Sequence, residues 1–568
     1  MRHDRTSACS LQASCPFDTV RYANPTLRRP QSASLPMIRG TRFRYLAAIG
    51  LLLLIGFFVR AISLDAQSLW RDEVDALRFA TAPWSEMVRN FTRPGWNGPL
   101  YYLLLRGWIA LTGTTEYAMR FFSLLFGVLC APLTYLVGRR LFNSSAGIIA
   151  ALLVTLSPYM VWYSQEVKMY TLVTALALLA IYSLRRALEG GGWPWWLTQI
   201  VATSLAFYAH ILAALLIPAQ VLLGLAWWPQ TRKRWRGALV SLACLTLPYL
   251  PLAVWQAPLA LQARETGFYD YSLRQMIVIL LNSWSTGVMG WGGPWAAAMM
   301  GVLAAGGLFS LAAFPTPSSK AEEEQAWDRS PRDWLVMTIW LAFPLLCVWL
   351  ISLRQPLFTD RYLIWSAPAF YLLVALALTS FASFNHWTQW VFVPLLGVIL
   401  AFSGVNVWKQ ATVPIKSDFR AAAAYVARHQ EPSAADEEPP SEAMSRYRVY
   451  LPITRAGSSD GQDLFIFQMP HGRYTFDYYF PLDAYAHAEG LYTNHRSPTG
   501  EYLMTEEQAA QQMREMTRGH NAAWLVATEM PMWDERHLVQ QWLDEHGRRV
   551  AEAHFKRVDV YRYELPNP

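Results

Sequence analysis

Acidic side chains follow directly on an apolar run in the stretch "SLWRDEVDALRF", residues 68–79. The run that precedes it, Phe43 to Leu64, is long enough to cross a bilayer. Asp72 and Glu73 therefore stand at a membrane boundary, where a carboxylate can act as general base and remove a proton from an acceptor hydroxyl. The simpler interpretation is a solvated helix start, because acids are favourable near the N-terminal dipole.

Two further polar clusters interrupt apolar sequence near the middle of the chain. "YSQEVKMY" (163–170) contains Glu166 and Lys168, and a lysine there offers a point charge for a phosphate. Its alternative is a polar hairpin between two spans. "FYAHILAAL" (207–215) contains His210, which is either a satisfied structural residue, a metal ligand or a hydrogen-bond donor to phosphate.

A third cluster, "LRQPLFTDRYLIW" (353–365), places Arg354 and Arg361 on either side of Asp360, with Tyr362 directly after. Anchoring of a helix by snorkelling arginines is one interpretation. A guanidinium fork also matches a phosphate, so we favour a phosphate clamp. The remaining polar pair is Arg264 and Glu265.

The composition is that of a membrane protein. Of the 568 residues, 53% are hydrophobic and 16% charged, whereas soluble domains carry roughly 25% charged residues. The formal net charge of +7 does not indicate nucleic acid, because much of it lies in short clusters beside apolar runs. The sequence also lacks a P-loop or a dinucleotide-binding glycine motif.

Hydropathy predicts an α-helical polytopic protein with about eleven spans. Lys and Arg clusters such as "TRKRWR" (231–236) fall on alternate loops, which places the N-terminus inside and residues 409–568 outside. The predicted spans are 43–64, 117–138, 146–163, 169–186, 195–210, 211–228, 237–256, 293–313, 334–353, 361–380 and 388–408.

Three parts follow from this pattern. Residues 1–42 are expected to form a disordered cytoplasmic tail, and residues 43–408 the transmembrane domain, with a first outside loop at 65–116. Within that loop, 98–113 is short for a span and is predicted to be an interfacial helix. Residues 409–568 are predicted to be a small extracytoplasmic α/β domain, in which "DLFIFQM", "AAWLVAT" and "VDVYRYEL" are strands, "DFRAAAAYVARH" and "TEEQAAQQMREM" are helices, and 431–442 is an acidic linker.

The unusual polar clusters all fall on the outside face in this topology. Charge at a membrane boundary is costly unless it is paired or hydrated, so several clusters on one face indicate one composite site. A phosphate ester bound there must be reachable from the outer face, which points to a lipid-linked phosphate. The residues expected to bind its phosphate are Lys168, Arg264, Arg354 and Arg361, with Glu166, His210, Asp360 and Tyr362 lining the cavity.

The ordered motifs resemble one family of membrane enzymes. "SLWRDEVDAL", "GPLYYLLLRGWIALTGTTEYAMRFFSLLFGVL", "YLVGRRLF", "SPYMVWYSQEVKMYTL", "FYAHILAAL" and "DRYLIWSAPAF" occur in the order and spacing of the dolichyl-phosphate-mannose protein mannosyltransferase-like glycosyltransferases, which include aminoarabinose lipid A transferases. The resemblance covers about residues 43–410, and "KSDFRAAAAYV" resembles the start of the domain that often follows.

The resemblance implies a C-type glycosyltransferase fold. Such enzymes transfer a sugar from a polyprenyl phosphate to an extracytoplasmic lipid, glycan or protein acceptor, usually with inversion, and lie in the plasma (inner) membrane. By the resemblance, Asp72 corresponds to the catalytic acid with Glu73 as support or alternative, Lys168 stands where relatives often have Arg, His210 matches a histidine near the cavity, and Arg361 is a donor-phosphate contact.

The sequence leaves the cofactor, the acceptor and the alternative classes of protein open. No cofactor is certain, and a divalent metal ion has candidate ligands in Glu73, Glu166 and His210. Relatives often read Pro-Pro-Leu where this chain has Asn97-Gly98 before Pro99, which leaves acceptor specificity in doubt. A transporter or lipid flippase would instead predict inverted repeats and polar residues at the midplane. A non-catalytic assembly protein would make the outside clusters dispensable.

Overall fold

The computed structural model describes residues 35–92, 97–261, 268–313, 332–384, 386–430, 463–480, 485–497 and 499–566. The chain divides into two compact units, Met1–Ala47 and Ala48–Pro568. Arg264 and the acidic linker 431–442 lie outside the described residues. All of the contacts discussed below lie within the second unit.

The helices before Thr412 make the chain a multi-pass membrane protein. Within the described ranges, eight helices are long and apolar enough to cross a bilayer, and a ninth is obtained if one bent pair counts as a span. The eight lie in α1 (Leu35–Ala61), α5 (Glu116–Leu141), α8 (Tyr170–Leu188), α12 (Trp235–Thr246) continuing into α13 (Leu250–Leu261), α15 (Gly293–Ala313), α17 (Asp333–Ser352), η3 (Asp360–Ser366) with α18 (Ala367–Phe384), and α19 (His386–Thr412).

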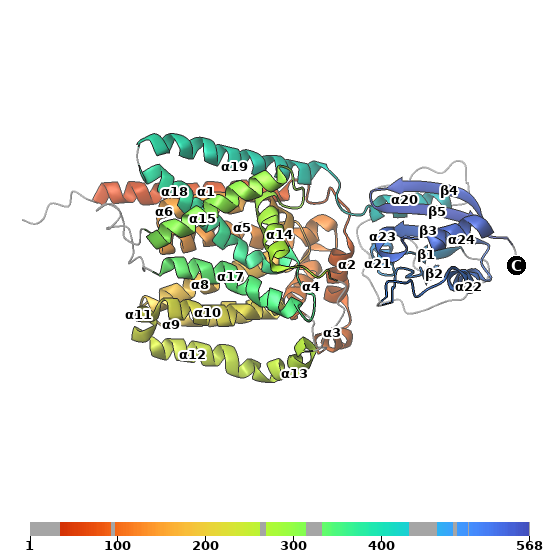
Figure 1. Ribbon diagram of the computed structural model, residues 1–568, viewed down its shortest axis with the longest axis horizontal. Helices are drawn as coiled ribbons and strands as arrows, with labels where there is room; N and C mark the ends of the chain where they lie inside the picture. The colour runs from red at the N-terminus through yellow and green to blue at the C-terminus, as the bar shows by residue number, and fades with distance from the viewer. Residues whose placement is uncertain are drawn as a thin grey trace, which may run out of the picture. The chain divides into compact units, whose positions relative to one another are not determined.

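The structure has fewer full spans than the eleven predicted, because two apolar regions are broken. Predicted spans 195–210 and 211–228 are the short helices α9 (Trp193–Ala209) and α10 (Leu216–Ala226), separated by the 3₁₀ turn η1 (Ile211–Leu215) (Figure 1). His210 ends α9 with extended backbone, and its Nδ1 accepts a hydrogen bond from the Leu212 amide at 3.3 Å. Each piece is shorter than the roughly 20 residues that a straight span needs.

Predicted span 146–163 is the bent pair α6 (Ser144–Leu156) and α7 (Pro158–Ser164), which meet at 57°. Ser157 starts α7, and its hydroxyl accepts a hydrogen bond from the Met160 amide, while Pro158 occupies the first turn. Proline lacks the amide that would continue the preceding helix, so the bend has a local cause. It brings α7 against α14 (Leu273–Thr286) and α19.

Three short helices lie in the segment 65–116 between α1 and α5: α2 (Arg71–Thr81), α3 (Trp84–Phe91) and α4 (Leu100–Thr112). The last of these confirms the predicted helix at 98–113. Arg106 on α4 donates hydrogen bonds to the carbonyl oxygens of Ala80 and Ala82 at 3.2 and 2.7 Å. This contact ties the end of α2 to α4 and orients the helix that begins with the acidic pair.

The C-terminal region contains a five-stranded sheet with the order β2-β1-β3-β5-β4. β1 runs parallel to β2 and β3, and β5 runs antiparallel to β3 and β4. The strands are β1 (Leu464–Phe467), β2 (Ala486–Glu489), β3 (Ala522–Thr528), β4 (Arg548–Phe555) and β5 (Val558–Glu564). The helices are α20 (Phe419–Gln430), α21 (Gly472–Tyr479), α22 (Glu506–Thr517), α23 (Met530–Trp533) and α24 (Leu538–His546) (Figure 1).

Alternate residues of β1 and β3 point to two separate apolar cores. Ile466 and Leu525 lie in the core that includes residues of α22 and α24, whereas Phe465 and Trp524 lie in the core that includes residues of α20 and α21. All seven residues of β3 are buried, as expected for a central strand covered on both faces. The three predicted strands and two predicted helices are confirmed; β2, β4, α21, α23 and α24 were not predicted.

A close helix contact in the membrane domain gives a test of the packing. A Cβ added to Gly307 on α15 would lie 2.1 Å from the carbonyl oxygen of Leu373 on α18, whereas one added to Gly306 meets nothing within 4 Å. We expect Gly307→Ala to destabilise the protein by about 1–3 kcal/mol through overpacking. Thermal unfolding in detergent measures the effect, and Gly306→Ala is the control that should leave the stability unchanged. Equal effects of the two substitutions would contradict this packing.

Candidate active site

Asp72 and Arg361 come from distant parts of the chain and form an ion pair. Asp72 lies in the first turn of α2, and its Oδ2 is 2.8 Å from Nη1 of Arg361 in η3. The Asp72 side chain is 31% exposed, so this carboxylate keeps an open side. Burial alone would raise the pKa of Asp72, but the charges of Lys168, Arg361 and Arg71 hold it below its ordinary value. The carboxylate is therefore ionised and able to accept a proton.

The start of η3 is fixed by two tyrosines of α7. Tyr159 donates a hydrogen bond to the carbonyl oxygen of Asp360 at 2.8 Å, and the hydroxyl of Tyr163 lies 3.3 and 3.4 Å from its two carboxylate oxygens. The Arg361 guanidinium lies 5.9 Å from the centre of the Tyr170 ring. These contacts set the direction in which Arg361 reaches Asp72.

Glu73, the neighbour of Asp72, has a wholly different environment. It is 0% exposed, and its two oxygens accept from Nε and Nη2 of Arg120 at 2.8 Å each. Lys416 Nζ lies 2.8 Å from Oε2, and the Val167 amide donates to Oε1 at 3.2 Å. Burial would raise the pKa of Glu73, yet Arg120 and Lys416 lower it to about 2. This arrangement favours a supporting role, because both oxygens are already engaged.

Glu166 is buried without such partners. It is 1% exposed, and neither carboxylate oxygen has a hydrogen-bond partner within the part of the chain that the structure describes. Burial raises the pKa of Glu166 to about 7, with the nearby carboxylates adding to the rise. Lys168, two residues on, is partly buried, and its charge lowers the pKa of Asp72. The loop between α7 and α8 thus places a buried carboxyl group and a cation near Asp72.

The remaining predicted residues divide into those that join this cluster and those that do not. His210 is 4% exposed, and its ring centre lies 5.0 Å from that of Tyr362 and 6.1 Å from that of Tyr170. Arg354 is exposed beyond the end of α17. Arg264 falls in 262–267, outside the described residues.

The three candidate metal ligands do not come together. No group of three His, Cys, Asp or Glu side chains suited to a metal ion occurs among the described residues. Glu73 is occupied by Arg120 and Lys416, and His210 uses Nδ1 to accept a backbone hydrogen bond. These residues therefore do not fit a shared metal site, and the chemistry considered below uses the cations of the chain.

Asn97 and Gly98, which replace the usual Pro-Pro-Leu start, contact the break at His210. Asn97 Oδ1 accepts a hydrogen bond from the Ile211 amide at 3.3 Å. A Cβ on Gly98 would lie 2.1 Å from the carbonyl oxygen of Tyr208, so only glycine allows this approach. The departure from the motif therefore joins the segment between α3 and α4 to the helix break at His210.

Arg120 and Lys416 belong to the site and were not predicted. Arg120 had a signal in the sequence, since a charged residue inside the apolar helix α5 is costly unless it is paired. Lys416 opens the stretch "KSDFRAAAAYV" that resembles relatives, but nothing in that stretch links it to Glu73, which it meets only through the tertiary fold.

The comparisons with known proteins agree with this arrangement. The family model for dolichyl-phosphate-mannose-protein mannosyltransferase matches residues 94–255. A search of curated protein sequences finds no match. The matched region includes Arg120, Glu166, Lys168 and His210.

Solved structures of membrane glycosyltransferases share the fold. ArnT from Cupriavidus metallidurans in the apo state has a TM-score of 0.51 at 14% identity, covering 93% of this chain and 98% of that one. ArnT bound to undecaprenyl phosphate scores 0.50 at 13% identity, with 92% and 98% covered. The archaeal oligosaccharyltransferase AglB from Archaeoglobus fulgidus, in complex with an inhibitory peptide and a dolichol-phosphate, scores 0.50 at 11% identity, with 92% and 74% covered. The predicted fold is confirmed.

The environment of Glu73 predicts a pH dependence. A carboxylate whose pKa falls from 4.5 to about 2 on folding stabilises the fold above pH 4.5, and this contribution is lost as pH falls toward 2. The difference corresponds to about 3 kcal/mol. We expect Glu73→Gln to be less stable at neutral pH and to lose less stability between pH 5 and pH 3 than the wild type.

Thermal unfolding in detergent across that pH range measures the effect. Glu86→Gln, which changes a partly exposed carboxylate on α3, is the matched control and should keep the wild-type slope. An unchanged slope in Glu73→Gln would contradict the ion pair with Arg120 and Lys416.

Proposed function

We propose that this chain is a membrane glycosyltransferase that moves a sugar from a polyprenyl-phosphate donor to an extracytoplasmic acceptor. The observation that carries the proposal is the ion pair between Asp72 and Arg361, with Lys168 close by. It combines an ionised base with two cations suited to a phosphate. The likeness to ArnT and AglB and the mannosyltransferase family match support the same reaction class.

In the proposed reaction, Asp72 accepts the proton of the acceptor hydroxyl as its oxygen bonds to the anomeric carbon. The bond from that carbon to the phosphate oxygen breaks, and its electron pair stays with the departing polyprenyl phosphate. A single displacement of this kind inverts the anomeric centre. The phosphate passes from diester to monoester and gains negative charge, which Arg361 and Lys168 stabilise.

The ion pair also supplies a way to couple donor binding to the base. Arg361 is 2.8 Å from Asp72 in this structure. A donor phosphate competes for the guanidinium, because Arg binds phosphate oxygens in bidentate fashion. Drawing Arg361 toward the phosphate exposes the Asp72 carboxylate to the acceptor and raises its basicity. Asp72 would then be most reactive when the donor is in place.

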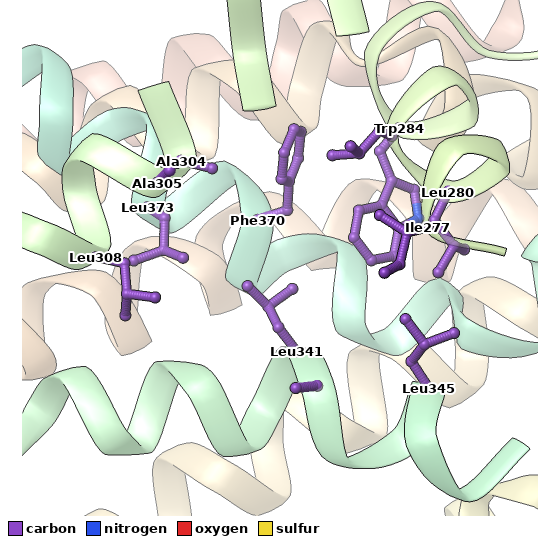
Figure 2. A pocket seen from close by; sticks show the side chains of 12 residues that line it. Ile277, Leu280, Trp284, Ala304, Ala305, Leu308, Leu341, Leu345, Phe370 and Leu373 are labelled. Carbon is purple, nitrogen blue, oxygen red and sulfur yellow. The ribbon is translucent and has the colours of Figure 1, made fainter. Parts of the chain in front are cut away.

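An apolar cavity offers a place for the lipid part of the donor. Its volume is about 250 Å³, and α14, α15, α17 and α18 line it with side chains such as Leu280, Trp284, Ala304, Leu341, Phe370 and Leu373 (Figure 2). The indole nitrogen of Trp284 is the polar atom among these side chains. Phe370 follows Arg361 by nine residues through η3 and α18, which is roughly 14 Å at the helical rise. A phosphate at Arg361 and a tail at Phe370 therefore lie on one continuous element.

The proposal extends to lipid and location. ArnT in one similar structure is bound to undecaprenyl phosphate, and AglB in another is in complex with a dolichol-phosphate, so a polyprenyl phosphate is the carrier proposed here. The distribution of Lys and Arg supports a cytoplasmic N-terminus and an extracytoplasmic C-terminal domain in the plasma (inner) membrane. A lipid, a glycan or a protein can each present the hydroxyl that the mechanism needs.

Replacing the base tests the mechanism. We expect Asp72→Asn to lower sugar transfer at least 100-fold, because the amide cannot accept the proton, while expression and melting temperature stay the same. Transfer is followed in proteoliposomes with undecaprenyl-phosphate-linked radiolabelled sugars, mannose and aminoarabinose first. Donor consumption also separates an enzyme from a transporter.

Asp75→Asn is the matched control, since Asp75 lies one turn along α2 and pairs with the exposed Arg78. It should keep wild-type turnover. Turnover near the wild-type level in Asp72→Asn would exclude Asp72 as the base.

Narrowing the cavity tests the lipid site. Ala304→Phe adds a ring to its α15 wall, and we expect it to raise the KM for a long polyprenyl-phosphate donor about 10-fold while leaving a two-isoprene donor unaffected. Ala312→Phe places the same ring at an exposed position of α15 and is the control. If the KM rises equally for both donor lengths, the polyprenyl tail of the donor binds outside this cavity.

A further inference from the structure

The segment that follows the last membrane helix is bound to the loop that leads to Asp72. The backbone amides of Ile415 and Lys416 donate to Oε1 of Gln67 at 2.8 and 3.0 Å. The Ser68 hydroxyl donates to the carbonyl oxygen of Ser417 at 2.6 Å. Because these bonds join positions more than 340 residues apart, residues 415–417 act as a strap across the base of the first outside loop.

Contacts on either side extend the strap. Gln67 Nε2 donates to the carbonyl oxygen of Gln410 at 3.2 Å, and Arg420 donates to that of Asp65 at 2.9 Å. Arg420 also pairs with Glu116 at the start of α5. The loop from Asp65 to Ser68 is thus held along its whole length by groups from 410–420.

The side chain of Lys416 extends from the strap into the buried part of the site. Its side chain is 4% exposed, and Nζ lies 2.8 Å from Glu73 Oε2. The ammonium also lies 5.5 Å from the centre of the Trp70 ring and 5.3 Å from that of Trp162. Trp70 directly precedes α2, and Glu73 lies in its first turn. Lys416 therefore contacts one residue on each side of the position at which this helix begins.

Asp72 lies between the two residues that Lys416 contacts, Trp70 and Glu73. Ion pairs with Lys416 and Arg120 therefore fix the first turn of α2 on its buried side, while Arg361 pairs with the Asp72 carboxylate itself. Within the part of the chain that the structure describes, Lys416 contacts Glu73, Trp70 and Trp162 and bonds neither Asp72 nor Arg361. Its effect on the base must pass through Glu73 and the backbone of this turn.

We propose that Lys416 is a positioning residue for the base, and that the strap 415–417 makes the segment after α19 a part of the active site. This inference rests on the proposed function for Asp72. Removing the ammonium leaves Glu73 with one cation instead of two and frees the start of α2 to shift. A shift of about 1 Å in the base is enough to cost up to 100-fold in rate.

The test compares variants of Lys416 in the full-length protein in proteoliposomes. We expect Lys416→Met to lower kcat 10- to 100-fold with the donor KM within 2-fold of wild type, and Lys416→Arg to restore most of kcat. Lys409→Met is the matched control, because Lys409 lies in the last turn of α19 and its ammonium lies over the Trp291 ring. It should leave kcat unchanged.

A second, milder variant covers the case in which Lys416→Met does not fold. Gln67→Ala removes the hydrogen bonds to Ile415 and Lys416 but keeps the charge of Lys416, and we expect kcat to fall 3- to 10-fold at an unchanged donor KM. Wild-type kcat in folded Lys416→Met, or a raised donor KM with unchanged kcat in either variant, would overturn the proposal.

Hydrogen–deuterium exchange separates this inference from the proposed function. We expect the amides of residues 69–76 to exchange at least 10-fold faster in Lys416→Met than in wild type or Lys409→Met, whether or not a donor is turned over. If Asp72→Asn loses activity while Lys416→Met keeps wild-type kcat and wild-type exchange, the role of the strap is refuted and the proposed enzymatic function stands. If the wild-type protein consumes no donor, the proposed enzymatic function is refuted. The exchange data would still decide whether the strap positions the start of α2.

Discussion

The buried carboxylate of Glu73 is the constraint on which the rest of the site depends. A charge with no exposure to solvent costs several kcal/mol unless cations and hydrogen-bond donors replace the lost water. Here Arg120 supplies two donors, Lys416 one, and the Val167 amide another. These groups come from α5, from the segment after α19 and from the loop after α7. Satisfying one carboxylate therefore brings three other stretches of chain together around α2.

Two adjacent acids are given different roles by this assembly. Glu73 points into the protein and is held ionised by two cations, whereas Asp72 keeps an exposed side and faces Arg361. Because consecutive residues in the first turn of a helix point in different directions, one neighbour can anchor the helix while the other faces the reacting groups. Glu166 adds a third environment, since it is buried with no hydrogen-bond partner in the described part of the chain. Separate surroundings for like groups are a common way to divide acid and base chemistry within one site.

The polar residues lie where helices break. His210 stands between α9 and η1, Asp360 and Arg361 begin η3 ahead of α18, and the bend between α6 and α7 leads to Glu166. In a membrane protein an irregular backbone is tolerated only where protein or a water-filled cavity satisfies its polar groups. The breaks shortened two predicted spans, and they also bring the polar groups to one place. The apolar cavity between α14, α15, α17 and α18 is lined on α18 by Phe370 and Leu373, which follow η3 along the chain.

The sequence by itself determined that the chain crosses a membrane several times, that polar clusters gather between its apolar runs, and that the strand-like stretches "DLFIFQM", "AAWLVAT" and "VDVYRYEL" belong to a terminal α/β region. Those conclusions rest on composition and local periodicity, which are properties of neighbouring residues. Asp72 and Arg361 were both found as candidates in this way. Only the tertiary structure decided that they form a pair, that Glu73 faces Arg120 and Lys416, and that Arg354 stays exposed. Ion pairs between residues hundreds of positions apart leave no periodic trace, because the partner that neutralises a buried charge is chosen by packing and not by spacing along the chain.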